Sequence, residues 1–278
     1  MIRTLGLGAL AFGTSGCWLM LGLDDNEYNR GAAPGGDGVL VQGEQPFYID
    51  ATEVTMRAYV DWVLTEPSTD GQDGRCTWND TFAPGVLSAG AEPGCTDGGE
   101  GTIDYELEAN LHPSFPARCV DWCDAYAYCA AHDKHLYGRI GGGGIQNTDV
   151  AGDFVDVAVS EWFAACSGLG ATAFAYGDAI EAGRCRDSQS HTEFGPTEVG
   201  TETCEGGVPG VFDMSGNVHE WVDACFDDQD PAVEACIRGG GSFALSAPDE
   251  LDCADDGTSS NLRRQLNDST GFRCCWEP

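Results

Sequence analysis

The sequence predicts a folded, loop-rich domain in which short helices and long loops are cross-linked by disulfides. Of its 278 residues, 42% are hydrophobic, which is enough to form a sizeable core. The chain also contains 39 glycines and 12 prolines, more than their usual share, so many turns are expected. Its 14 cysteines include no paired Cys-x2-Cys zinc signature. We therefore interpret them as disulfides formed in an oxidising compartment.

The net charge restricts the classes of partner. The chain has 46 acidic and 13 basic residues, which gives a formal net charge of −33. Such a charge repels polyanions, so we exclude nucleic acid and an anionic membrane surface as partners.

The first 23 residues are typical of an export signal. They read MIRTLGLGALAFGTSGCWLMLGL, with one arginine ahead of an apolar stretch. Thr14-Ser15-Gly16-Cys17 resembles the lipobox of bacterial lipoproteins, which predicts lipidation at Cys17. Two alternatives stay open: residues 5–23 form an uncleaved anchor helix, or the signal is cut elsewhere and the protein is secreted. All three place the rest of the chain outside the cytoplasm, with membrane contact only through this segment.

The chain then divides into a tether and one domain. Residues 24–45 are Gly-rich and acidic without periodicity, and predict a tether, while residues 46–278 form the domain. A first helix is predicted from Met56 to Val63, where apolar residues recur at i, i+3, i+4 and i+7 and Thr55 precedes them as a cap.

Two further helices are predicted later in the chain. Asp121 and Asp124 have the spacing of a capping box, and an apolar stripe continues from there to Cys129. A short third helix is predicted to begin at Ser160.

Disulfide connectivity does not follow from sequence, but two local pairs are the simplest guesses. Cys76 and Cys95 flank one loop, and Cys225 and Cys236 flank another.

Several ordered motifs resemble the sulfatase-modifying-factor family, the formylglycine-generating-enzyme-like domains. The longest match is the run GVFDMSGNVHEW at 210–221, and RGGGSF at 238–243 and GFRC at 271–274 follow it. Earlier matches are FYID at 47–50, residues 116–129 with VDW and DAYAYC, and SEW at 160–162. The resemblance implies an α+β fold, a variant of the C-type-lectin-like architecture with low regular secondary structure and long loops.

The same resemblance implies where an oxidase site should lie. Family oxidases convert a sulfatase cysteine to formylglycine with oxygen and copper, held by two thiolates spaced Cys-x4-Cys after the RGGS-aromatic motif. Thiolate is the soft ligand that Cu(I) requires. Those two positions fall here on Leu245 and Glu250, neither of which carries sulfur. We therefore expect no copper and no catalytic residues at this place.

The resemblance also implies a calcium site. Carried over to this chain, its ligands would be the carboxylates of Asp213 and Glu220 and the carbonyls of Gly216 and Val218. A second family calcium loop would need an Asn where Arg186 stands, so we do not expect that one.

One pair of histidines is close enough in sequence to suggest a metal site. His132 and His135 are three residues apart at the end of the second predicted helix, but no third ligand is evident. We interpret them as surface histidines.

Two functions stay open. The first is an exported binding or structural module without oxidase activity, whose ligand is a peptide or a carbohydrate. The alternative is an enzyme, a copper-dependent protein-cysteine oxidase of the formylglycine-generating type, with thiols supplied by displaced cysteines such as Cys236 and Cys253.

Overall fold

The computed structural model describes residues 38–87, 90–91, 95, 104–146, 149–190, 194–200, 203–226, 234–255 and 262–278. The predicted export segment and Cys17 lie outside these residues. Among the described residues, no helix has the length and apolar character needed to cross a bilayer.

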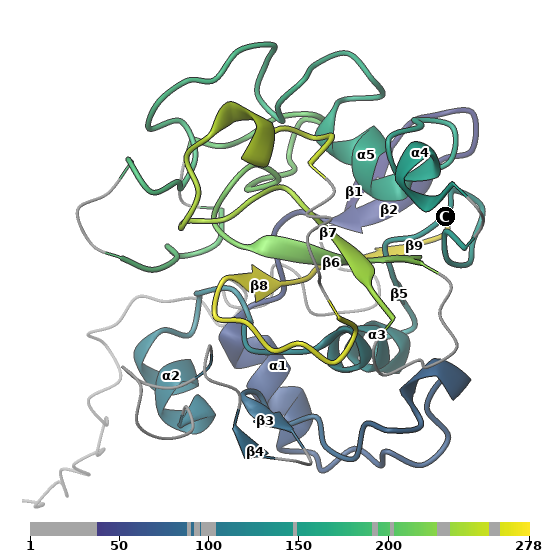
Figure 1. The fold of residues 1–278 in the computed structure, drawn as a ribbon, viewed down its shortest axis with the longest axis vertical. Coiled ribbons are helices and arrows are strands. Elements are labelled where there is room, and N and C mark those ends of the chain that lie inside the picture. Colours follow the sequence, from purple (N-terminus) through teal and green to yellow (C-terminus); the bar gives the residue numbers. More distant parts are fainter. Residues whose placement is uncertain are drawn as a thin grey trace, which may run out of the picture.

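Two small sheets occupy the middle of the molecule, with helices on either side (Figure 1). The four-stranded sheet has the order β1-β2-β9-β5, and the three-stranded sheet has the order β7-β6-β8. The strands of these sheets are β1 (Gly38–Val41), β2 (Phe47–Asp50), β5 (His135–Leu136), β6 (His219–Cys225), β7 (Cys236–Gly239), β8 (Thr270–Gly271) and β9 (Cys274–Trp276). A separate hairpin pairs β3 (Val86–Leu87) with β4 (Gly90–Ala91).

The helices are short and separated by long loops. They are α1 (Met56–Val63), α2 (Tyr105–Leu111), α3 (Trp122–Ala131), α4 (Val150–Phe154) and α5 (Glu161–Cys166), with single 3-10 turns η1 (Gly74–Cys76) and η3 (Pro248–Glu250). In Figure 1, α1, α2 and α3 lie on one side of the sheets and α4 and α5 on the other.

All three predicted helices are present with their predicted caps. The Thr55 side chain accepts from the Ala58 amide, and Asp121 and Asp124 accept from each other's amides in a capping box. Ser160 accepts from the Phe163 amide at the start of α5. These ends are predictable because a capping side chain bonds to backbone only two or three residues away.

Strand β6 divides the core because both of its faces are buried. Val222 and Ala224 point into a cluster with α4, α5 and β2, whereas Trp221 and Cys225 point into a cluster with α1 and α3. This follows from the period of two along a strand. Two indole hydrogen bonds join β6 to the start of α3 and to the residues just before it. The Trp122 indole donates to the Val222 carbonyl, and the Trp221 indole donates to the Val120 carbonyl.

The segment expected as a tether contributes to the fold. Gly38–Val41 forms β1, which pairs antiparallel with β2, and the Val41 side chain is fully buried. Four residues are too few for a periodicity to stand out in a Gly-rich stretch, which is why the sequence suggested no strand there.

Six disulfides cross-link the described residues. They join Cys76 to Cys123, Cys95 to Cys119, Cys129 to Cys274, Cys166 to Cys253, Cys185 to Cys204, and Cys225 to Cys236. The Cys225–Cys236 guess is confirmed, because the two residues face each other across β6 and β7. The Cys76–Cys95 guess is wrong, because each of these cysteines bonds instead to the segment that carries α3.

Candidate functional site

An open cleft lies between α2, the loop at 194–197 and the aromatic residue of the RGGGSF motif. Its volume is about 510 Å³. It is lined by Glu108, His112, Phe115, Arg118, Arg186, Phe194, Gly195, Pro196, Thr197, Phe243 and Asp268. Five separate stretches of the chain contribute to this lining, so no local sequence pattern could have announced it.

Aromatic rings and both signs of charge meet in this cleft. Phe194 is 80% exposed and packs edge-on against buried Phe243, with 5.0 Å between ring centroids. Arg118 pairs with Glu108 at 3.3 Å, and both side chains line the same cleft. An exposed phenylalanine beside paired charges is a surface that can hold an apolar side chain and polar backbone together.

The two positions expected for copper ligands do not line the cleft. Leu245 is half-buried, and its carbonyl accepts from the Ser188 amide at 2.8 Å. Glu250 ends η3, where its carboxylate accepts from the Ala247 amide at 3.2 Å. Both residues therefore stabilise local backbone.

The cysteines nearest to these positions are not thiols. Cys236 is bonded to Cys225, and Cys253 to Cys166. Among the described cysteines, Cys275 alone is free, and it is fully buried on β9. Burial raises the pKa of the Cys275 thiol well above its usual value, so it stays protonated.

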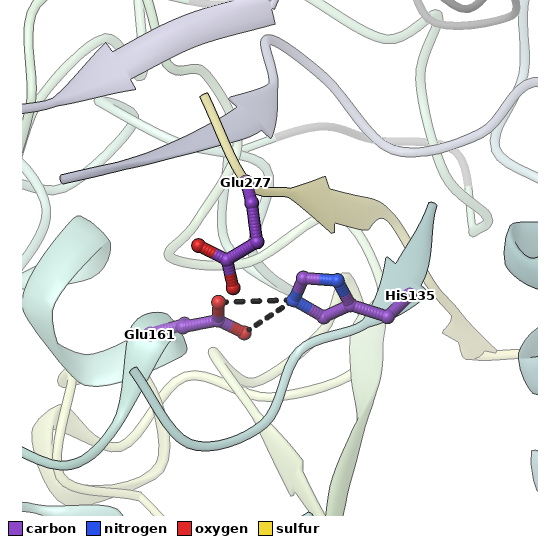
Figure 2. Close-up of side chains that lie close together, drawn as sticks. All are labelled: His135, Glu161 and Glu277. Atoms are coloured by element: carbon purple, nitrogen blue, oxygen red, sulfur yellow. Dashed lines mark hydrogen bonds and ion pairs between the residues drawn. The ribbon is translucent and has the colours of Figure 1, made fainter. Parts of the chain in front are cut away.

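The two histidines considered as a metal pair point to different places. His132 stacks on Tyr128, and its Nδ1 lies 2.7 Å from the Tyr128 carbonyl. His135 instead directs Nε2 at the Glu161 carboxylate, 3.0 and 3.1 Å from its two oxygens (Figure 2). Glu277 reaches the same place from the end of β9. Neither partner was predictable from the sequence, because neither lies near His135 along the chain.

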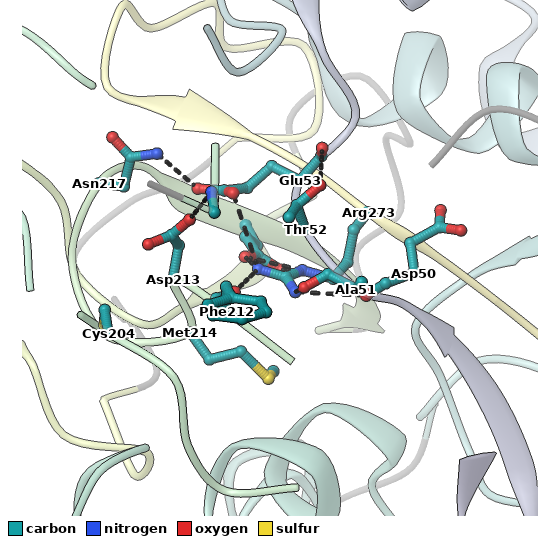
Figure 3. A network of polar contacts seen from close by, with 12 residues as sticks. Asp50, Ala51, Thr52, Glu53, Cys204, Phe212, Asp213, Met214, Asn217 and Arg273 are labelled. Carbon is teal, nitrogen blue, oxygen red and sulfur yellow. Dashed lines mark hydrogen bonds and ion pairs between the residues drawn. The ribbon is translucent and has the colours of Figure 1, made fainter. Parts of the chain in front are cut away.

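The residues expected around calcium lie in or beside a buried polar network centred on Arg273 (Figure 3). The guanidinium bonds Glu220 at 2.6 Å and donates to the carbonyls of Ala51 and Phe212. Glu53 lies 3.9 Å from the same guanidinium.

Carboxyl groups outnumber cations in this network. Burial, and then the charge of Asp213, raise the pKa of Glu53 well above its usual value. Glu53 also accepts from the Asn217 amide group at 2.8 Å, and Asp213 accepts from the Gly200 amide at 2.6 Å. Glu220 and Glu53 thus lie beside the guanidinium, and Asp213 lies close enough to Glu53 to raise its pKa.

The turn that contains Gly216, one of the two expected carbonyl ligands, has a backbone conformation that only glycine adopts without strain. Gly216 has a φ of +94°, and a Cβ there would lie 2.4 Å from the Arg186 carbonyl oxygen. Val218 is buried next to the start of β6. Calcium prefers oxygen ligands, and Asp213 offers a carboxylate of that kind. Glu220 fits less well, because both of its oxygens accept from Arg273 and one also accepts from the Tyr137 hydroxyl.

Arg186 stands where the family resemblance would need an asparagine for a second calcium loop. Its guanidinium donates to the Gly195 carbonyl at 2.8 Å and lies over the Phe243 ring at 6.0 Å from the centroid. These contacts support one wall of the cleft.

Comparison with known families agrees with these motifs and with the geometry. The sulfatase-modifying factor enzyme 1-like domain matches residues 25–278. The chain belongs to this family. The match confirms the fold class expected from sequence, an α+β variant of the C-type-lectin-like architecture with little regular secondary structure and disulfide-stapled loops.

Solved structures offer more distant similarity. The chain is similar to CarF, with 20% identity, a TM-score of 0.49, and coverage of 84% of this chain and 87% of that one. It is also similar to PvdO from Pseudomonas aeruginosa, with 18% identity, a TM-score of 0.48, and coverage of 89% and 90%. No curated protein sequence matched the chain.

Proposed function

We propose that this chain is an exported binding member of its family that does not perform the copper-thiolate oxidation. One observation carries the proposal: among the described residues, no two free thiols exist to hold a copper ion. Cu(I) needs soft ligands, and a protonated, buried Cys275 is a single poor one. The alternative, a formylglycine-generating oxidase, is favoured only by the family match. That match does not provide the second thiolate that the copper site would require.

The cleft is the place where a ligand would bind, and we infer that the ligand is an extended peptide. Phe194 offers an exposed aromatic anchor that is held in place by Phe243. The Arg118–Glu108 pair adds a donor and an acceptor suited to a peptide backbone. The alternative ligand, a carbohydrate, would also stack on an aromatic ring, so the test must include both.

The binding test compares peptides and glycans on the same protein. The wild type and a Phe194→Ala variant are screened against a displayed random-peptide library and a glycan array. We expect the wild type to select peptides and the variant to retain them at least about tenfold less well. Selection of glycans alone would overturn the peptide assignment. Equal retention by both proteins would overturn the assignment of the cleft.

Calcium binding by the turn at 213–220 is a further part of the proposal. The ion would be held by the carboxylate of Asp213, the carbonyls of Gly216 and Val218, and the carboxylate of Glu220, which would have to turn away from Arg273 to reach it. It would neutralise the excess of carboxyl groups around Arg273 and so stabilise the fold.

Export and anchoring rest on the sequence and the disulfides. Six disulfides among the described residues are typical of an oxidising compartment. We propose a lipid on Cys17. Labelling of cells with a radioactive fatty acid should mark the wild type and not a Cys17→Ser variant, and labelling of both would contradict lipidation at this residue.

A further inference from the structure

A second cluster of charged side chains lies away from the cleft, where β5, α5 and the end of β9 meet (Figure 2). His135, Glu161 and Glu277 each place one nitrogen or oxygen so that all three atoms lie within 4.8 Å of one another. We call these residues the edge cluster. We propose that it binds one divalent transition-metal ion of the zinc class, through one imidazole nitrogen and two carboxylate oxygens.

The sheet register brings His135 and Glu277 together. His135 pairs with Cys275 across β5 and β9. Directly opposed residues of an antiparallel pair share a face, and residue i+2 of a strand lies on that face too. Glu277, two residues beyond Cys275, is therefore a diagonal neighbour of His135, within reach of a long side chain.

Glu161 approaches the same point from the start of α5 and is held rigidly. Its side chain is fully buried, and its Oε2 accepts from the Gly138 amide at 2.8 Å. Metal-ligating carboxylates are oriented by such outer hydrogen bonds. His135 is 30% exposed, which leaves an open side for water or another ligand to complete the coordination.

The charges favour a cation at this point. Within the described part of the chain, neither Glu161 nor Glu277 forms an ion pair with lysine or arginine. Lys134, the residue just before His135 and the only lysine in the sequence, instead pairs with Asp50 at 2.5 Å and lies over the Trp276 ring. Two carboxylates beside one imidazole thus carry an excess of negative charge, which a divalent ion would neutralise.

The geometry also suits a small transition metal. With bonds of about 2.0–2.1 Å in a tetrahedral site, ligand atoms lie roughly 3.3 Å apart. The His135–Glu161 separations of 3.0 and 3.1 Å are already close to that value, and an oxygen of Glu277 lies within 4.8 Å of the ligand atoms of both. Imidazole suits zinc-like ions, while an all-oxygen set would suit calcium or magnesium. A bound ion would fasten the end of β9 to α5.

The test is a titration of the full chain with Zn²⁺ against a chromophoric chelator, with Cys17→Ser in every protein to remove its thiol. We expect about one tight Zn²⁺ per chain and a higher melting temperature with the metal. Glu277→Gln, which changes an exposed side chain, should weaken binding at least about tenfold and abolish the thermal shift. His135→Ala should do the same.

Two controls keep the result specific. His132→Ala should bind Zn²⁺ like the wild type, since that ring contacts Tyr128 instead. Asp213→Asn should also leave Zn²⁺ binding unchanged, which separates this site from the calcium turn. Absence of Zn²⁺ binding, or equal affinity in the wild type and Glu277→Gln, would overturn the proposal and leave the edge cluster as a structural ion pair.

Discussion

The cross-linked body of the molecule and the segment that follows Phe243 differ in their use of cysteine. In the body, cysteines are common and nearly all of those described are in disulfides. At the two positions after Phe243 where the family resemblance implies copper cysteines, the chain has Leu245 and Glu250, and neither lines the cleft. The described cysteines thus serve almost entirely in disulfides, and none stands at either position where a copper-thiolate site would need one. A high cysteine count alone therefore says nothing about redox activity.

The largest expected effect is on the cross-linked body. Replacing Cys129 and Cys274 by alanine opens a loop of 145 residues and should lower the free energy of unfolding by about 5 kcal/mol on the chain-entropy model. The matched control replaces Cys225 and Cys236, which are only 11 residues apart, and should cost about 3 kcal/mol. Urea unfolding at fixed pH measures both. A larger loss in the short-loop variant would show that the body is not held as described.

Calcium removal comes next in size. Chelation should lower the stability of the wild type by about 3 kcal/mol if the ion is present at one hundred times its Kd. An Asp213→Ala variant should show no such drop, because it lacks the ion already. Thermal unfolding with and without chelator decides the matter, and equal shifts in the two proteins would refute the calcium site.

A pH effect should arise at the start of α3, which carries two of the cross-linking cysteines. Burial raises the pKa of Asp121 to about 7, above its unfolded value of 3.8. The folded state therefore holds a proton that the unfolded state has lost, and stability should fall as pH rises from about 4 to 7. The slope is about 1.4 kcal/mol per pH unit for one proton.

An Asp121→Asn variant tests this directly. Asparagine caps a helix about as well as aspartate but carries no charge, so the variant should fold and show a flatter pH dependence. Urea midpoints at pH 4.5 and pH 7 give the slopes. Parallel curves for the two proteins would mean that the buried carboxyl does not titrate in this range.

The smallest stability effect is expected in the cleft. Phe194 is 80% exposed, so Phe194→Ala should change the free energy of unfolding by no more than about 0.5 kcal/mol. Thermal unfolding provides the measurement. A clearly destabilised variant would mean that the Phe194 ring helps to hold the fold together. Weaker peptide binding by Phe194→Ala would then not show that the ligand binds in the cleft.

Local features of the fold were predictable, and features built from distant segments were not. Thr55, Asp121 and Ser160 were recognisable as caps because each bonds to backbone two or three residues ahead. The family motifs placed Asp213 and Glu220 near one another in a turn and strand, and both lie at the Arg273 network.

The cleft and the edge cluster depend on tertiary placement. Phe194 meets Phe243 only because the loop at 194–197 folds back over the RGGGSF turn. His135 meets Glu277 only through the β5–β9 register, which no local spacing encodes. The Cys76–Cys95 prediction was wrong because tertiary placement, and not proximity in sequence, decides which cysteines face each other.

We propose that this family member lacks copper-thiolate oxidase chemistry. This is tested by incubating the protein with copper, oxygen and a peptide of the form Cys-x-Pro-x-Arg, and analysing the peptide by mass spectrometry. We predict that the peptide cysteine is recovered without formylglycine. Formylglycine produced by the wild type, and lost when Cys275 is replaced by serine, would contradict the account.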